Sequence, residues 1–149
     1  MFVELSKDKI HQYFQNGKFQ ELLNYFCRVE ENYIIIDYYY FKYLGTSQTY
    51  NIFTNLVIGH IDDILKKYES FNVNVSINKL SIMEINKHLS YIRNISELLK
   101  IKYQNKMEKC FIYNSSNLFS QIYEIIIPLI DVDTQKKIEI VCKKNKNYM

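Results

Sequence analysis

Apolar positions in the first thirty residues recur at the spacing of short helices. They fall three or four residues apart on both sides of Asn16 and Gly17, a dipeptide that is typical of turns. The pattern predicts one or two short helices, and their apolar positions are Ile10, Phe14, Leu22, Leu23 and Phe26. The next stretch, "YIIIDYYYF" at residues 33–41, is rich in β-branched and aromatic side chains, which predicts the first strand.

The middle of the chain alternates between helical and strand patterns. Helical spacing resumes after the break at "GTSQ", with apolar positions at Ile52, Leu56, Ile61, Ile64, Leu65 and Tyr68. Residues 71–80, "FNVNVSINKL", alternate apolar and polar side chains, which predicts a strand with one face covered more than the other. "SIME" at residues 81–84 has the spacing of a capping box and opens a helix that we expect to reach about Tyr103. The inward positions of this helix are Ile85, Leu89, Ile92, Ile95 and Leu99.

The last third of the chain continues the alternation. "KCFIYN" at residues 109–114 predicts a strand, Ser115 or Ser116 caps a helix that reaches Ile130, and "KKIEIV" at residues 136–141 predicts the last strand. Helices that alternate with strands indicate an α/β fold, with helices packed around a small, mostly parallel sheet. We expect one domain over residues 1–149, divided into a short helical N-terminal part (1–31), an α/β core (32–142) and a basic tail (143–149).

Composition narrows the class of protein only a little. The 149 residues suit one domain, and a hydrophobic content of 48% is enough for a core. The three cysteines form no CxxC pair, and the N-terminus shows no apolar signal region, so we expect a cytoplasmic protein with free thiols. A net charge of +3 permits weak attraction to anionic lipid or nucleic acid. The lysines near the C-terminus are Lys136, Lys137, Lys143, Lys144 and Lys146.

Motifs of known catalytic and metal sites are absent from the sequence. It contains no GxGxxG, GxxxxGK[ST], GxSxG or HExxH pattern. His60 lies near Asp62 and Asp63, but residues two positions apart on a helix do not share a face, which favours a solvated helix edge over a metal site. Cys110 opens a strand without a neighbouring arginine and is interpreted as a core thiol. We therefore expect no enzyme, no catalytic residues and no metal.

One segment is unusually apolar. "LFSQIYEIIIPLI" at residues 118–130 carries apolar side chains on almost every side, and Glu124 is its only charged residue. A helix of this kind is either a central helix of the core or one wall of an apolar ligand cavity. The pattern alone leaves both interpretations open.

The region around this segment resembles the C-terminal half of the CRAL-TRIO lipid-binding domain, the fold of phosphatidylinositol/phosphatidylcholine transfer proteins. The likeness runs from residue 71 to residue 141 and extends weakly over residues 33–70. Upstream, "VNVSINKLS" is similar to the family strand that ends in Asp-Leu-Lys-Gly. The positions that match the family's ordered motifs are Asn78, Tyr103, Lys106, Ile112, Asn114, Phe119, Pro128, Asp131, Thr134, Lys137 and Ile138.

The resemblance implies a sheet floor, a helical wall and a movable gating helix within residues 116–130, over a lipid cavity. It implies that Lys137 contacts the lipid phosphate. The residues expected to line the apolar cavity and gate are Val75, Ile77, Phe111, Tyr113, Phe119, Ile122, Tyr123, Ile126 and Ile130. The implied function is the non-enzymatic binding or transfer of a lipid or other small apolar ligand, with peripheral contact to intracellular membranes. No cofactor is expected apart from a phospholipid carried as cargo.

The chain also departs from the family pattern. Val73 and Val75 take the places of headgroup-binding hydroxyls, and Asn105 takes the place of a glutamate. A single remaining lysine pairs with a phosphate but does not specify inositol. The alternative function is therefore a protein-interaction scaffold or homodimer that keeps the fold and has lost the lipid pocket. Nucleic acid is disfavoured as a partner, because no RNA-binding signature accompanies the tyrosines.

Overall fold

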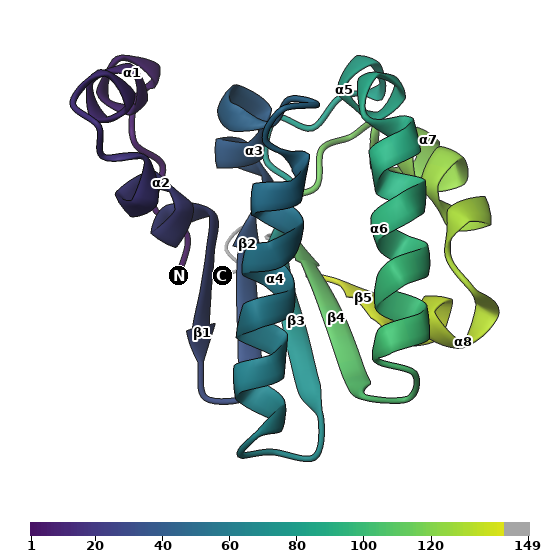
Figure 1. The fold of residues 1–149 in the computed structure, drawn as a ribbon. Coiled ribbons are helices and arrows are strands. Elements are labelled where there is room, and N and C mark those ends of the chain that lie inside the picture. The colour runs from purple at the N-terminus through teal and green to yellow at the C-terminus, as the bar shows by residue number, and fades with distance from the viewer. Residues whose placement is uncertain (142–149) are drawn as a thin grey trace, which may run out of the picture.

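The structure is a computed structural model that describes residues 1–141 (Figure 1). The predicted basic tail at residues 143–149 and Cys142 lie outside the described residues. The strands are β1 (Cys27–Glu30), β2 (Tyr33–Asp37), β3 (Phe71–Ser76), β4 (Met107–Tyr113) and β5 (Ile138–Ile140). The helices are α1 (Lys7–Gln15), α2 (Phe19–Phe26), α3 (Tyr38–Leu44), α4 (Tyr50–Leu65), α5 (Ile82–Lys87), α6 (Leu89–Lys102), α7 (Phe119–Ile126), the 3-10 turn η1 (Ile127–Leu129) and α8 (Val132–Gln135).

The strands form one five-stranded sheet in the order β1-β2-β3-β4-β5. β1 pairs antiparallel with β2, and the other neighbouring pairs are parallel. The expected α/β fold with a mostly parallel sheet is therefore confirmed. Because the order is sequential and such crossovers are right-handed, successive connections place their helices on one face of the sheet. Figure 1 shows α4 and α6 covering that face side by side.

In the N-terminal third, the sequence pattern missed one strand and predicted another strand to be too long. The two expected helices are present as α1 and α2, but a short strand, β1, follows them directly. The strand expected over residues 33–41 ends at Asp37, and its last residues belong to α3. The Asp37 carboxylate accepts a hydrogen bond from the Tyr39 main-chain N–H at 3.1 Å, so it caps the new helix. This local cap outweighs the strand preference of the tyrosines.

The helix expected from "SIME" to Tyr103 is divided in two. The Ser81 hydroxyl accepts a hydrogen bond from the Glu84 N–H at 3.2 Å, which is one half of the expected capping box, while the Glu84 carboxylate accepts from the Tyr38 hydroxyl. The helix then breaks at His88, between α5 and α6. His88 is buried, and its Nδ1 lies 2.5 Å from the Tyr50 hydroxyl on α4. This long-range contact lies at the break, and the apolar pattern gave no sign of it.

The well-packed core lies under α2, α3 and α4. Its largest fully buried members include Tyr40, Phe53, Leu22 and Ile34. Aromatic rings fill much of this region, for example Phe26 against Phe53 with centroids 4.7 Å apart. The dense core therefore occupies the β1–β2 side of the fold.

Candidate functional site

The β4–β5 side of the sheet is less completely buried than the β1–β2 side. None of the residues of α6, η1, β4 or β5 is buried, although α6 carries apolar side chains along its whole length. Since folded interiors are normally close-packed, apolar surface left half-exposed beneath a helical layer is unusual. We call this surface the loose apolar region, and its half-buried members are Val75, Ile77, Ile92, Ile95, Ile112 and Ile126.

The strand register separates the four strand residues that were expected to line one cavity. Val75 pairs with Ile112 and follows Val73, which packs against the core beneath the helices. Because side chains alternate along a strand, Val75 and Ile77 lie on the helix-covered face. Phe111 pairs with Asn74, and Tyr113 with Ser76, so both aromatic residues lie on the opposite face. The structure therefore places these residues on two different surfaces.

The expected gating segment is shorter as an α-helix and more amphipathic than its sequence indicated. Ile122 is only 1% exposed. Phe119, Tyr123 and Ile126 are half-buried, whereas Ser120, Gln121 and Glu124 form an exposed side. α7 ends at Ile126 because Pro128 has no N–H to continue the helical bonding, and the chain turns through η1 instead. Ile130 follows this turn and is half-buried.

The start of α7 also differs in detail from the expected serine cap. Ser116 accepts a hydrogen bond from the Leu118 N–H through its hydroxyl at 3.2 Å, and its carbonyl accepts one from the Phe119 N–H at 3.0 Å. The helix itself begins only at Phe119, without a side-chain cap. The serine thus orders the turn that leads into α7.

Lys137 lies at the amino end of β5, away from the start of α7. Its carbonyl accepts a hydrogen bond from the Cys110 N–H at 2.9 Å, which fixes the backbone beside β4. Its side chain is half-buried, and within residues 1–141 no carboxylate forms an ion pair with it. The neighbouring Lys109 pairs with Glu139 at 3.2 Å. Lys137 is therefore a cation that remains available to an anionic group.

The opposite face of the sheet carries a buried polar row that the sequence analysis did not identify as a site. Asn72, Asn74 and Ser76 of β3 are buried, while Val73 and Val75 are only half-buried. β3 is thus covered more on one face, as predicted, but the better-covered face is the polar one. The alternation in "FNVNVS" was the available signal, because it places these three polar side chains together.

Residues at the start of the chain contact this polar face. The Arg28 guanidinium donates to the Met1 carbonyl, and the Asn74 amide donates to the Met1 sulfur at 3.3 Å. The Phe2 ring lies 5.4 Å from the ring of Tyr113. The Leu5 N–H donates to the Tyr40 hydroxyl at 3.0 Å. These contacts bring the N-terminal segment onto the sheet.

Asp37 lies at one end of this polar face, beside Ser76. It is 1% exposed, and its Oδ2 has no hydrogen-bond partner within the described chain. Burial disfavours the charged form and raises the pKa of the carboxyl from 3.8 to about 6, while the hydrogen bond from Tyr39 partly opposes the increase. The Asn74 Oδ1 is also buried without a donor among residues 1–141. Within the described residues the polar face therefore contains two acceptors without a hydrogen-bond partner.

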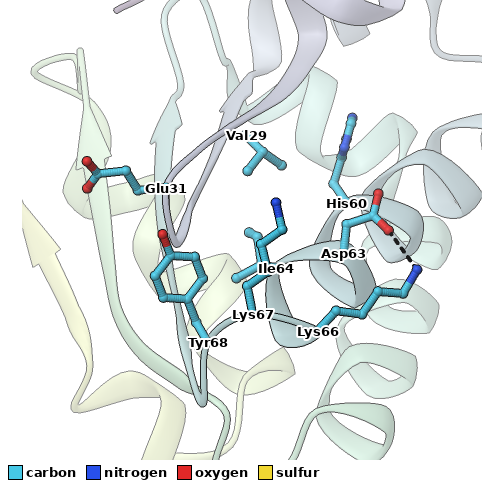
Figure 2. Close-up of a pocket in the computed structure, with 8 residues that line it drawn as sticks. All are labelled: Val29, Glu31, His60, Asp63, Ile64, Lys66, Lys67 and Tyr68. Atoms are coloured by element: carbon cyan, nitrogen blue, oxygen red, sulfur yellow. Dashed lines mark hydrogen bonds and ion pairs between the residues drawn. The ribbon is translucent and has the colours of Figure 1, made fainter.

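Two surface recesses stand out, and none of the residues expected to line a lipid cavity borders them. The first has a volume of about 510 Å³ and lies between the β1–β2 turn and the end of α4. Figure 2 shows His60, Asp63 and Lys66 on one side of it and Glu31 and Tyr68 on the other. The second recess, of about 440 Å³, lies between α4 and α6 and has an uncharged lining that includes Tyr50, Tyr91 and Ile95.

The described residues provide no evident catalytic centre. Burial raises the pKa of the Cys110 thiol to about 12, so it is protonated at neutral pH. Asp62 accepts a hydrogen bond from the Tyr103 hydroxyl at 2.6 Å, and Asp63 pairs with Lys66 at 3.2 Å. Within residues 1–141 there is no cluster of three or more His, Cys, Asp or Glu side chains suited to a metal ion.

Comparisons with known proteins identify the class to which this fold belongs. The profile of the CRAL/TRIO domain matches residues 47–149, so the chain belongs to the CRAL/TRIO domain family, whose members generally bind or transfer lipids. A solved structure with the same fold is the crystal structure of Sfh5, at 15% sequence identity and a TM-score of 0.70. The alignment covers 85% of this chain and 50% of the Sfh5 chain, so the match spans about half of that protein. A search of curated proteins found no match.

Within residues 1–141 no helix combines the length and the apolar character needed to cross a bilayer.

Proposed function

We propose that the protein binds a phospholipid or another small apolar ligand and carries it between intracellular membranes without converting it chemically. The observation that supports this function is the loose apolar region beneath α6 and α7, in a chain of the CRAL/TRIO family. Each methylene removed from water contributes about 0.8 kcal/mol, so an acyl chain that completes the packing of this region binds without any reaction. The tails would contact Val75, Ile77, Ile122 and Ile126.

The dimensions of the sheet suit such a ligand. β4 contains seven residues, which span about 20 Å at the rise of a parallel strand. One leaflet of a bilayer provides about 15 Å of hydrocarbon, half of its ~30 Å core. An extended acyl chain of that length therefore covers most of β4, although not all of it.

Lys137 is the proposed partner of the lipid phosphate. It stands at the amino end of β5, where a headgroup would lie if the tails extend toward α7. A lysine presents a point charge that pairs with a phosphate but makes no bidentate contact that distinguishes one headgroup from another. We therefore propose a ligand defined by its apolar tails and one phosphate rather than by an inositol ring.

Mass spectrometry of the purified full chain tests this function. The protein is incubated with vesicles of phosphatidylcholine and phosphatidylinositol, separated from them, and analysed under native conditions, with the retained lipid identified after extraction. We expect one lipid per chain. Lys137→Gln should reduce retention about tenfold, while Lys136→Gln, an exposed lysine one position earlier, should leave it unchanged.

A second pair of variants tests the apolar contact. Ile126→Glu places a charge in the loose apolar region and should abolish retention, whereas Gln121→Glu adds the same charge on the exposed side of α7 and should not. Light scattering distinguishes a lipid-loaded monomer from the alternative, a homodimer without lipid. The proposal is wrong if the wild-type chain retains no apolar ligand from either vesicle.

A further inference from the structure

Residues 1–5, which we call the strap, cross the polar face of the sheet without forming a helix or strand. At one end the Arg28 guanidinium of β1 donates a hydrogen bond to the Met1 carbonyl. At the other end the Tyr39 hydroxyl of α3 donates to the Leu5 carbonyl at 2.6 Å. Within residues 1–141 no backbone group of the strap pairs with a strand. Side chains therefore hold the strap in place, and segments without backbone pairing are among the first to open in a folded protein.

The strand register places the strap over Asp37. Met1 contacts Arg28 of β1 and Asn74 of β3. Both of these residues pair with Ile35, in the middle of β2. The other end of the strap contacts α3, which follows β2 directly. The strap therefore passes over the end of β2, where Asp37 is only 1% exposed.

Two buried acceptors beneath the strap lack a donor. Asp37 Oδ1 accepts from the Tyr39 N–H, but neither Asp37 Oδ2 nor Asn74 Oδ1 has a hydrogen-bond partner within residues 1–141. Asn74 lies diagonally across the β2–β3 pair from Asp37, on the same face of the sheet. A proton on Asp37 Oδ2 supplies one donor for both groups, because a carboxylic acid donates through its hydroxyl. The closed strap therefore suits the protonated carboxyl, whereas a carboxylate loses its water there.

Arg28 stands between two partners. Its guanidinium donates to the Met1 carbonyl in the closed strap. Its pairing partner on β2 is Ile35, two residues before Asp37, so Arg28 and Asp37 lie on the same face of the sheet. A carboxylate offers the guanidinium an opposite charge and a two-point contact, which a backbone carbonyl does not. Ionisation of Asp37 therefore draws Arg28 away from the strap.

The charged groups around Asp37 belong to the strap, which contributes Glu4, and to β1, which contributes Arg28. Burial raises the pKa of Asp37 to about 6, and the Tyr39 N–H opposes this increase. Glu4 adds to the increase, whereas Arg28 opposes it. α3 contributes Tyr39 and Tyr40, and burial raises the pKa of both phenols, so they stay neutral below pH 7. The side chains of β3 on this face are uncharged.

We propose that the strap is a proton-dependent cover of the polar face. It stays closed while Asp37 is protonated. It opens when Asp37 releases its proton to solvent and Arg28 moves from the Met1 carbonyl to the Asp37 carboxylate. Opening uncovers the polar row of β3. The strap lies on the face of the sheet opposite α4 and α6, so this inference does not depend on the proposed lipid site.

Burial and protonation together set the direction of the response. In the closed state the pKa of Asp37 is about 6, and in the open state the solvated carboxyl returns toward 3.8. Protons therefore favour the closed strap, and the open fraction increases as pH rises from about 4 to about 6. A difference of about two pKa units corresponds to a change of about 100-fold in the ratio of open to closed strap. Roughly 50-fold of this change falls between pH 4 and pH 7.

Hydrogen exchange of the Leu5 amide in the full chain tests this cover. The Leu5 N–H donates to the Tyr40 hydroxyl at 3.0 Å, and opening of the strap frees it for exchange. Its protection factor is measured by NMR and corrected for the intrinsic exchange rate at each pH. We expect this factor to fall roughly 50-fold between pH 4 and pH 7. The N–H groups of β3, the central strand, report unfolding of the whole sheet and should be better protected than Leu5 throughout.

Three variants identify the titrating group. Asp37→Asn keeps the cap on α3 and carries an uncharged amide donor, so its Leu5 protection should stay constant over this pH range. Glu4→Gln should still respond to pH, because Asp37 remains. Asp63→Asn is the matched control, since that carboxylate is 69% exposed on α4, and it should respond as the wild type does. Circular dichroism of each variant confirms that it is folded.

Any of three results overturns the proposal. The first is Leu5 protection in the wild type that does not change with pH. The second is an unchanged response in Asp37→Asn, or its loss in Glu4→Gln, because another group then titrates. The third is exchange of Leu5 no faster than that of β3, because the strap then opens only when the whole sheet unfolds.

Discussion

The substitution Asp37→Asn should stabilise the protein at neutral pH, although it removes a native carboxylate. Asp37 is 1% exposed, its Oδ2 has no hydrogen-bond partner in the described part of the chain, and burial raises its pKa from 3.8 to about 6. At ~1.36 kcal/mol per pKa unit, this difference corresponds to about 3 kcal/mol of unfavourable free energy for the ionised form in the folded state. Asparagine caps helices about as well as aspartate, so the bond from the Tyr39 N–H is kept.

The gain should be somewhat smaller than this upper value. The new amide group must itself find an acceptor, and an unsatisfied buried amide costs about 1–3 kcal/mol. Asn74 lies diagonally across the β2–β3 pair on the same face of the sheet, and its Oδ1 has no donor within residues 1–141, so it is the candidate acceptor. We therefore expect the free energy of unfolding at pH 7.5 to increase by about 1–3 kcal/mol in Asp37→Asn.

The pH dependence identifies the cause. The folded-state pKa of Asp37 lies above the value of 3.8 expected in the unfolded chain, so between about pH 4 and pH 6 the folded state binds more protons. The wild type therefore loses stability as pH rises through this range, and the asparagine variant does not. The difference between the two proteins should be largest above pH 6 and should vanish near pH 4.

Urea unfolding followed by circular dichroism at pH 7.5 and pH 4.0 measures both effects. Asp63→Asn is the control, because that side chain is 69% exposed and its pair with Lys66 contributes little. Its stability should stay within about 0.5 kcal/mol of the wild type at both pH values. The reasoning is refuted if Asp37→Asn is no more stable than the wild type at pH 7.5 and the difference between the two proteins is the same at pH 4.0. That result would show that solvent or Arg28 compensates the ionised carboxylate.

Two further predictions concern packing around the proposed site. Ile122→Ala should lower the free energy of unfolding by about 2–4 kcal/mol in urea titrations, because the side chain is 1% exposed. Leu118 lies one turn earlier and is 51% exposed, so Leu118→Ala should change the free energy of unfolding by less than about 1 kcal/mol. Equal effects would contradict the amphipathic arrangement of α7. Tyr103→Phe removes the 2.6 Å hydrogen bond to Asp62 that joins the end of α6 to α4, and should cost about 1–2 kcal/mol by thermal unfolding. The exposed Tyr68→Phe should have no measurable effect, and an equal loss there would refute this assignment.

Features set by neighbouring residues could be predicted from the pattern of the chain. The helix that became α4 and the strands β3 and β4 lie close to where apolar spacing placed them. The Ser81 cap formed as expected. Such features depend on contacts within a few residues, which is why hydrophobic period and capping residues report them. The order of helices and strands was then enough to indicate the parallel sheet, because βαβ crossovers have a fixed hand.

The candidate site was predictable only in part. The spacing of Phe119, Ile122 and Ile126 along one helix was sufficient to bring them to the same side of α7. Whether Val75 and Phe111 share a face of the sheet depends on the register between β3 and β4, which the sequence of a single strand does not contain. The register places them on opposite faces.

By itself the sequence determined most of the helices and strands, the α/β class and the family resemblance, because each depends on local periodicity or on ordered motifs. Only the tertiary structure decided which surfaces of the sheet are buried. It buried the polar side of β3, where Asn74 contacts Met1 from the far end of the chain, and left the apolar side half-covered. Burial depends on what residues distant in sequence place over a surface, and a local pattern carries no information about those distant partners.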